Sequence, residues 1–250
     1  MRKIFLMAVI LTLGQHIFSQ NDSNYLALGL YINPNIMYRT AWIKPGYEGD
    51  FDYKKFLKEE FPIFGYSYGL SITWKRFQIG DIETGIFLSQ KGYGWGHKID
   101  VPDSIANFQY DPGFLYPEEF KVKDVFNFID IPLLLKRNIL LGEKITIYGK
   151  GGLGLNILLN SKRLTHTYYI DETEDDYHYD IKLSELKDHK FRNVYYSVLF
   201  SFGTSIPITQ NINIQSEAIL NHFILTSWKA GDVSVRFFET GIKTGLSYKF

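Results

Sequence analysis

Apolar side chains alternate with small or polar ones along eight separate stretches of the chain. The stretch 64–74 shows this most plainly, because Tyr66, Leu70 and Trp74 fall on one side of it and serine, glycine and threonine on the other. Successive side chains of a β-strand point to opposite faces, so each stretch predicts a strand with one apolar face. The predicted strands are 25–33, 64–74, 77–90, 125–136, 145–159, 194–206, 212–222 and 237–250.

The segments that join these strands alternate strictly between short and longer ones. The short ones are 74–77, 137–144 and 207–211, and the longer ones are 39–63, 92–124, 160–193 and 223–232. A barrel with turns at one end and loops at the other requires this alternation and an even number of strands. The sequence therefore predicts an all-β fold, an eight-stranded antiparallel up-and-down transmembrane β-barrel.

A soluble β-fold is the main alternative. A lipocalin-like barrel or a sandwich would hold its large apolar residues inside and turn its polar face to water. Here the polar face carries glycine and serine repeatedly, which is too little volume for a soluble core, so the pattern favours lipid around the apolar face. Pro132 has no amide hydrogen and predicts a bulge or a local break in strand pairing.

Residues 1–19 have the order of a secretory signal peptide. Arg2 and Lys3 precede an apolar run over 4–13, which is shorter than the ~20 residues that a membrane-spanning helix needs. No later stretch is apolar for the ~18 residues that predict such a helix. We expect cleavage near Ser19, so that 20–250 form the barrel domain. A buried N-terminal helix is the alternative.

Composition narrows the function classes. Lys plus Arg and Asp plus Glu are equal at 27 each, so no overall positive charge favours nucleic acid. Cysteine is absent, which excludes disulfides, thiolate catalysis and Cys-ligated metals. Aromatic residues make up 17% of the chain and glycine is frequent, as expected for strands with aromatic girdles and a small-residue lumen face.

Charged residues recur on the small-residue face of the predicted strands. They are Glu83, Asp130, Lys136, Lys150, Glu217 and Lys243. An eight-stranded barrel is wide enough only for its own side chains or for one small ligand, and isolated buried charges are costly. We therefore expect a paired charge network that fills the lumen. A narrow polar pathway or a small-ligand site is the alternative.

An acidic segment lies in the third long connection. Its carboxylates are Asp171, Glu172, Glu174, Asp175, Asp176 and Asp180, with Tyr168 and Tyr169 just before them and Tyr177 and Tyr179 among them. Carboxylates suit Ca²⁺, but the spacing matches no EF-hand loop. We expect a solvated loop, and the tyrosines favour contact with a protein or a glycan.

Few residues have the pattern of a catalytic site. His222 and Ser216 are six residues apart on one predicted strand, roughly 20 Å by the strand rise, so they cannot act as a pair. Glu217 lies beside Ser216, and Ser227 in the following loop is the remaining partner for His222. Hydrolase, metalloprotease and phosphate-loop motifs are absent. We predict no enzymatic activity and no cofactor or metal, with a lipid-modifying outer-membrane enzyme as the alternative.

Four stretches carry a family resemblance. They read Phe128-Ile-Asp-Ile-Pro-Leu-Leu-Leu-Lys136, Ile147-Tyr-Gly-Lys-Gly-Gly-Leu-Gly-Leu155, Glu83-Thr-Gly-Ile-Phe-Leu-Ser-Gln-Lys-Gly92 and Gly241-Ile-Lys-Thr-Gly-Leu-Ser-Tyr-Lys-Phe250. Together they resemble the PorT-like outer-membrane β-barrel family. The type member of that family is implicated in a Gram-negative protein-secretion and gliding system, and most members have no assigned function. Phe250, with Tyr248 and Leu246, resembles the C-terminal signal that the barrel-assembly machinery reads.

The resemblance implies a location and a general role. It implies an integral protein of the cell outer membrane whose partners are outer-membrane lipid and the barrel-assembly machinery. We expect a structural or interaction protein, an accessory of envelope protein secretion or surface adhesion, that contacts other envelope proteins through its long loops. We expect no nucleic-acid partner.

Overall fold

The computed structural model describes residues 25–43, 60–77, 80–98, 117–141, 144–169, 177–182, 192–224 and 233–250. The strands are β1 (Tyr25–Ile43), β2 (Glu60–Phe61), β3 (Ile63–Phe77), β4 (Gly80–Lys98), β5 (Pro117–Leu141), β6 (Thr146–Tyr169), β7 (Tyr177–Lys182), β8 (Val194–Pro207), β9 (Ile212–Phe223) and β10 (Val233–Lys249). No helix in this part of the chain is long and apolar enough to cross a membrane.

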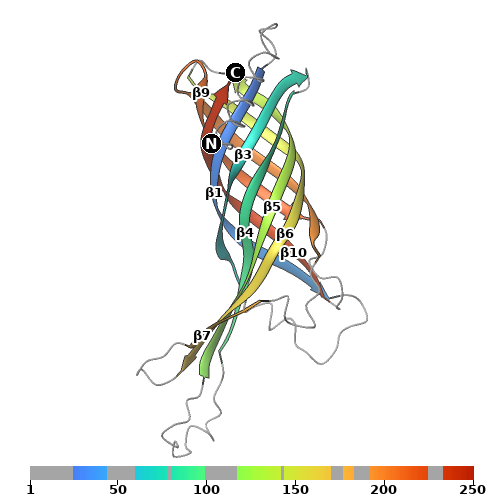
Figure 1. Ribbon diagram of the computed structural model, residues 1–250, viewed down its shortest axis with the longest axis vertical. Coiled ribbons are helices and arrows are strands. Elements are labelled where there is room, and N and C mark those ends of the chain that lie inside the picture. The colour runs from blue at the N-terminus through green and yellow to red at the C-terminus, as the bar shows by residue number, and fades with distance from the viewer. Residues whose placement is uncertain are drawn as a thin grey trace, which may run out of the picture.

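Eight of these strands close into one antiparallel barrel (Figure 1), in the order β1, β3, β4, β5, β6, β8, β9, β10. The last strand pairs with the first from Ala27–Lys249 to Ile43–Val233, so the barrel wall has no free edge. The predicted all-β, closed, eight-stranded antiparallel barrel is confirmed. We call the end with the short connections the turn end and the opposite end the loop end. Phe250 lies at the turn end, where its amide donates to Leu26 O at 2.9 Å.

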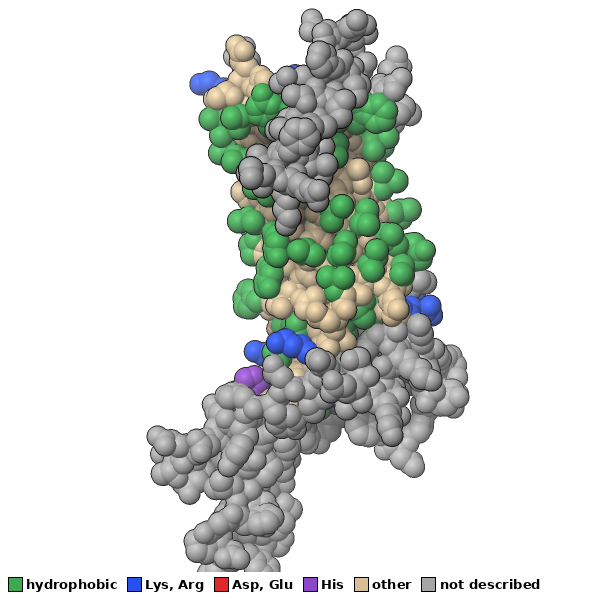
Figure 2. All heavy atoms as spheres, viewed as in Figure 1, with side chains coloured by type: hydrophobic (Ala, Val, Ile, Leu, Met, Phe, Trp, Pro, Cys, Tyr) green, Lys and Arg blue, Asp and Glu red, His purple; other side chains and the backbone are tan. Residues whose placement is uncertain are grey.

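The barrel wall is apolar outside and small or polar inside. On β3, Phe64 and Leu70 are 84% and 61% exposed, whereas Ser71 and Thr73 on the opposite face are buried. Figure 2 shows hydrophobic side chains over the visible wall, with Lys, Arg and His at its borders. The stretch 64–74 matches the ~9–11 residues with which a tilted strand crosses a bilayer. This is the architecture of outer-membrane β-barrels.

The strands run further toward the loop end than the sequence pattern predicts. β1 continues to Ile43 rather than 33, and β5 and β6 span 25 and 24 residues. Backbone pairing continues there although the alternation of apolar and polar residues fades. Beyond the paired row of Tyr93, Asp124 and Arg163, strands β4 to β7 form what we call the projecting sheet, which Figure 1 shows extending past the barrel.

Pro132 interrupts one ladder, as predicted. The β4–β5 ladder has no pair between Thr84–Leu133 and Phe87–Asp130, and its register is the same on both sides of the gap. The Thr84 hydroxyl donates to Pro132 O at 2.8 Å across this gap. The proline is therefore accommodated by a local break without a bulge on the β4 side.

Candidate functional site: the barrel lumen

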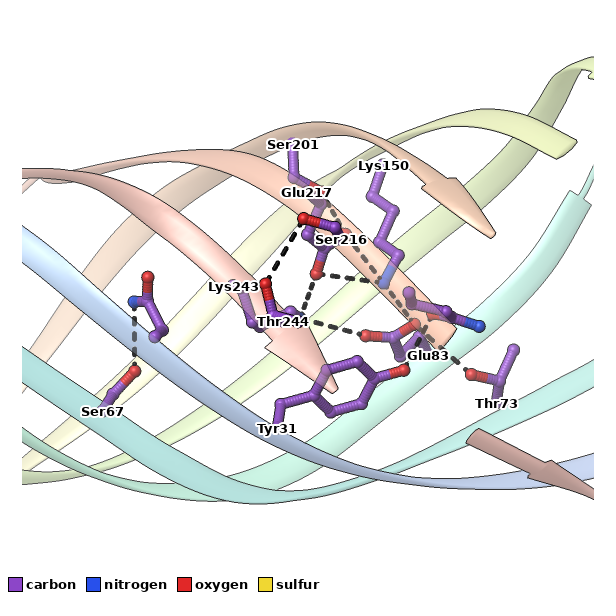
Figure 3. Close-up of polar contacts among 12 residues, drawn as sticks. Tyr31, Ser67, Thr73, Glu83, Lys150, Ser201, Ser216, Glu217, Lys243 and Thr244 are labelled. Atoms are coloured by element: carbon purple, nitrogen blue, oxygen red, sulfur yellow. Dashed lines mark hydrogen bonds and ion pairs between the residues drawn. The ribbon is translucent and has the colours of Figure 1, made fainter. Parts of the chain in front are cut away.

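All six predicted lumen charges lie on the inner side of the barrel wall. Four of them, Glu83, Lys150, Glu217 and Lys243, form what we call the central cluster, which Figure 3 shows in close-up. Lys150 Nζ lies 2.6 Å from Glu83 Oε2 and 3.0 Å from Glu217 Oε2. Lys243 Nζ lies 3.5 Å from Glu83 Oε1 and also contacts Glu217 Oε1. Two carboxylates and two ammonium groups therefore balance within the cluster.

Hydroxyl groups complete the surroundings of the carboxylates in the central cluster. Thr73 donates to Glu83 at 3.3 Å, and Ser201 donates to Glu217 at 3.0 Å. Lys136 has a different environment, with its ammonium group 4.1 Å from the centroid of the Tyr148 ring. Because the lumen excludes most water here, each hydrogen bond to a carboxylate offsets part of its desolvation cost.

A second group of charges, the Lys91 cluster, lies nearer the loop end. Lys91 Nζ is 2.8 Å from Asp130 Oδ2 and 3.1 Å from Glu239 Oε2. Glu239 also accepts amide hydrogen bonds from Asn33, Asn35 and Asn221. Asp130, which the sequence placed in the lumen, is thus joined to a lysine and a glutamate that the prediction did not include.

A third group lines the loop-end rim of the lumen. Arg39 forms an ion pair with Glu60, and its guanidinium carbon lies 3.8 Å from the centroid of the Tyr93 ring. Arg163 makes two parallel hydrogen bonds to Asp124, at 2.7 and 2.8 Å. Arg163 lies on β6 beyond the apolar band, and the hydrogen bonds to Asp124 raise the pKa of its guanidinium group.

Between the Lys91 cluster and this rim, aromatic rings fill the lumen. This aromatic plug consists of Tyr93, Phe126, Phe128, Tyr195, Phe223 and Phe237, all at most 2% exposed. Ring centroids are 5.1 Å apart for Phe126 and Phe237 and 5.4 Å apart for Phe128 and Tyr195. Tilted and edge-to-face ring packing of this kind is favourable and leaves little space. The plug closes the lumen toward the loop end.

Several lumen residues were not predicted from the sequence. The alternation of apolar and polar residues could have assigned some of them to the inner face, but not others. Glu239 has the same strand parity as Lys243, and Lys91 has the same parity as Glu83, so both were within reach of the alternation argument. The predicted third strand ended one residue before Lys91. Arg39 and Asp124 lie outside the predicted strands, so no signal assigned them a face.

Those of the other candidate residues that the structure describes are not brought into a catalytic or metal-binding arrangement. Ser216 lies 3.3 Å from the Thr244 hydroxyl, and the His222 ring packs 6.3 Å from that of Phe238. Ser227 and the acidic residues 171–176 lie outside the described residues, whereas Asp180 is on β7. Within the described ranges, no three His, Cys, Asp or Glu side chains converge as metal ligands.

The candidate assembly residues lie at the end of β10. Leu246 and Tyr248 face outward and are 52% and 42% exposed. The rings of Tyr248 and Phe250 meet edge to face, 4.9 Å apart. These three residues therefore form an apolar strip on the outer wall at the turn end.

Comparison with known proteins gives only remote likeness. No protein-family model matches the sequence, and no curated protein matches it. Among solved structures, Neisserial surface protein A is 12% identical, with 90% of this chain and 99% of that chain covered and a TM-score of 0.36. OprG from Pseudomonas aeruginosa is 10% identical, with 91% and 96% covered and a TM-score of 0.41. Ail of Yersinia pestis is 12% identical, with 90% and 99% covered and a TM-score of 0.29.

Proposed function

We propose that this protein is an integral barrel of the cell outer membrane that acts as a structural or interaction protein. In this proposal the apolar outer wall faces outer-membrane lipid, the turn end faces the periplasm and the projecting sheet lies outside the cell. The single observation that supports the interaction role most strongly is the combination of a filled lumen with strands that continue past the apolar band. A barrel whose interior is occupied by its own side chains has its recognition surface outside the lumen.

The proposal extends to family and partners. The resemblance to PorT-like barrels supports a role as an accessory of envelope protein secretion or surface adhesion, with other envelope proteins as partners at the loop end. The strip of Leu246, Tyr248 and Phe250 on the outer wall supports recognition by the barrel-assembly machinery. We assign no catalytic activity, and lipid A of unchanged composition in a deletion strain is the expected result; a changed lipid A would favour the enzyme alternative.

Site-specific photo-crosslinking tests the interaction role. A photoreactive amino acid at Lys123, in the projecting sheet, is expected to capture a defined protein in intact cells. The same amino acid at Arg137, an exposed position at the turn end, is the matched control and is expected to give a different pattern. Absence of any protein adduct specific to Lys123, with normal barrel assembly, would contradict an interaction role for the projecting sheet.

A further inference from the structure

A small cavity lies inside the barrel where the central cluster and the Lys91 cluster meet. Its volume is about 60 Å³, and its polar lining includes Asn33, Asp130, Asn221 and Glu239. Apolar side chains, among them Leu134, line the remainder. The cavity is thus lined by residues of both clusters and by residues from all eight strands of the barrel wall.

The polar lining offers three oxygen atoms that accept no hydrogen bond of ordinary geometry from the described residues. In the described part of the chain, Asn33 Oδ1, Asn221 Oδ1 and Asp130 Oδ1 have no hydrogen-bond partner, and the two asparagines are 2% and 3% exposed. Their amide nitrogens each donate to Glu239 at 3.1 Å, so exchanging nitrogen and oxygen would lose those bonds. Buried acceptors without donors are unfavourable, so this lining calls for an electropositive occupant.

The lining also carries one negative charge that the described residues do not balance. Lys91 is the only ammonium group within ion-pair distance of either Asp130 or Glu239 among the described side chains. Lys243 lines the cavity too, but it is held by the two carboxylates of the balanced central cluster. Two carboxylates against one lysine leave a net charge of −1, and an uncompensated buried charge is strongly unfavourable.

We propose that this cavity binds one monovalent cation, sodium or potassium, through Asn33 Oδ1, Asn221 Oδ1 and Asp130 Oδ1. Amide and carboxylate oxygens are the ligands that hard cations prefer. One positive charge balances the lining, whereas a divalent ion would leave an excess of the opposite sign. A water molecule needs roughly 10–15 Å³ by the same measure, so the ion fits together with water ligands. The proposal does not depend on the interaction role.

Anomalous diffraction tests the site directly. Crystals of the full barrel soaked with thallium(I), a potassium substitute that scatters anomalously, are expected to show one anomalous peak in contact with Asp130, Asn33 and Asn221. A cavity that holds water alone, or thallium bound only elsewhere, would overturn the proposal. This measurement uses the unaltered protein, so it does not depend on any variant folding.

Thermal stability in different salts tests the site in solution. The folded barrel is heated in KCl, NaCl or N-methyl-D-glucamine chloride at equal ionic strength, the last cation being too large for the cavity. At a small-ion concentration near 100 times Kd, we expect midpoints roughly 5–10 °C higher than in the large-cation salt. Equal midpoints for the unaltered protein in all three salts would overturn the proposal.

Two variants test whether the difference in thermal midpoint between salts arises at the cavity. Asp130→Asn removes the excess charge and is expected to abolish the difference between salts. Asp124→Asn, which alters a buried carboxylate paired with Arg163 away from the cavity, is expected to keep it. If Asp130→Asn does not fold, Asn221→Leu replaces it with the same expected loss. Persistence of the salt difference in the cavity variant would overturn the assignment.

Discussion

Lys150 lies between two carboxylates in the lumen, and both come from strands that are not its neighbours. Its ammonium group is 2.6 Å from Glu83 on β4 and 3.0 Å from Glu217 on β9, while β6 itself pairs with β5, β7 and β8. Each contact therefore reaches past a neighbouring strand to the second strand along the barrel wall. These ion pairs are strong because little water screens the charges. The same low dielectric makes any charge that loses its partner costly.

Removing this lysine is expected to destabilise the barrel. Lys150→Met leaves Glu83 and Glu217 to share Lys243, so one buried carboxylate loses its counter-charge. The expected loss is about 3–5 kcal/mol in the free energy of unfolding. Urea unfolding of the detergent-refolded barrel, followed by tryptophan fluorescence, measures it.

Lys144→Met is the matched control for this prediction. Lys144 is exposed at the turn end, so the same substitution there is expected to change the free energy of unfolding by less than about 0.5 kcal/mol. A double variant, Lys150→Met with Glu217→Gln, is expected to recover part of the loss because the charges balance again. Equal stability of the Lys150 and Lys144 variants would contradict a structural role for the central cluster.

The sequence predicts which residues enter the lumen better than it predicts their partners. Alternation along a strand assigned Glu83 and Lys150 to the inner face, and pairing of adjacent strands brings Lys243 opposite Glu217. Contacts across the lumen depend on barrel diameter and strand tilt, which no local pattern encodes. The ion pair between Lys91 on β4 and Glu239 on β10 is of this kind.

At the level of the strand, β6 carries two adjacent glycines in opposite environments. A Cβ atom on Gly152 would collide with the backbone oxygen of Leu133 on β5, whereas one on Gly151 would meet the Phe200 ring at 3.5 Å, an ordinary contact. Gly152 therefore permits close approach of the β5 backbone, and Gly151 is not constrained in this way.

The two glycines give a matched pair of substitutions. Gly152→Ala is expected to lower the free energy of unfolding by about 1–3 kcal/mol, because backbone must move to admit the methyl group. Gly151→Ala is expected to be tolerated. Urea unfolding of both variants checks the difference, and equal stability of the two would show that the close approach of β5 and β6 is not constrained by Gly152.

The end of β10 affects assembly more than stability in this account. Phe250→Ala keeps the backbone hydrogen bond from residue 250 to Leu26 but removes the terminal ring, so the refolded barrel is expected to remain stable. In cells, we expect a severalfold smaller folded fraction in the outer membrane, measured from the heat-modifiable gel band. Ile208→Ala, an exposed apolar position at the same end, is the control and is expected to assemble normally. Normal assembly of the Phe250 variant would contradict the signal.

Strand boundaries were predicted closely for β8 and β9 and less closely for strands that continue past the predicted alternation. β8 and β9 end within one residue of the predicted limits, since their alternation covers the whole strand. β5 begins at Pro117 rather than 125 because its outer part pairs with β4 and β6 where the alternation of apolar and polar residues fades. Backbone hydrogen bonds alone can maintain a strand, but they do not require apolar and polar residues to alternate, so the sequence shows no pattern there.

At the level of the whole molecule, three groups of charges and one aromatic plug fill most of the barrel lumen around one small cavity. The charge groups link strands by ion pairs, some between neighbouring strands and some between strands further apart in the wall, and the aromatic plug occupies the lumen toward the loop end. A barrel of eight strands has little interior space to begin with. The described part of the molecule is therefore a closed barrel with an apolar surface rather than an open channel.

Because the interior is closed, we expect the barrel not to conduct ions. The barrel reconstituted in a planar lipid bilayer in KCl is expected to give no steady stepwise currents. A porin reconstituted in the same way is the positive control. Reproducible single-channel steps from the barrel alone would contradict the closed lumen and would favour the narrow-pore alternative.

The central claim is that the apolar wall of a closed barrel faces the lipid of the outer membrane. Fractionation of the native host, followed by gel electrophoresis with and without boiling, tests it most directly. We expect the protein in the outer-membrane fraction, with an unboiled band that migrates differently from the boiled one because the barrel stays folded in detergent. A protein recovered from the soluble periplasm, with the same mobility before and after boiling, would contradict the account.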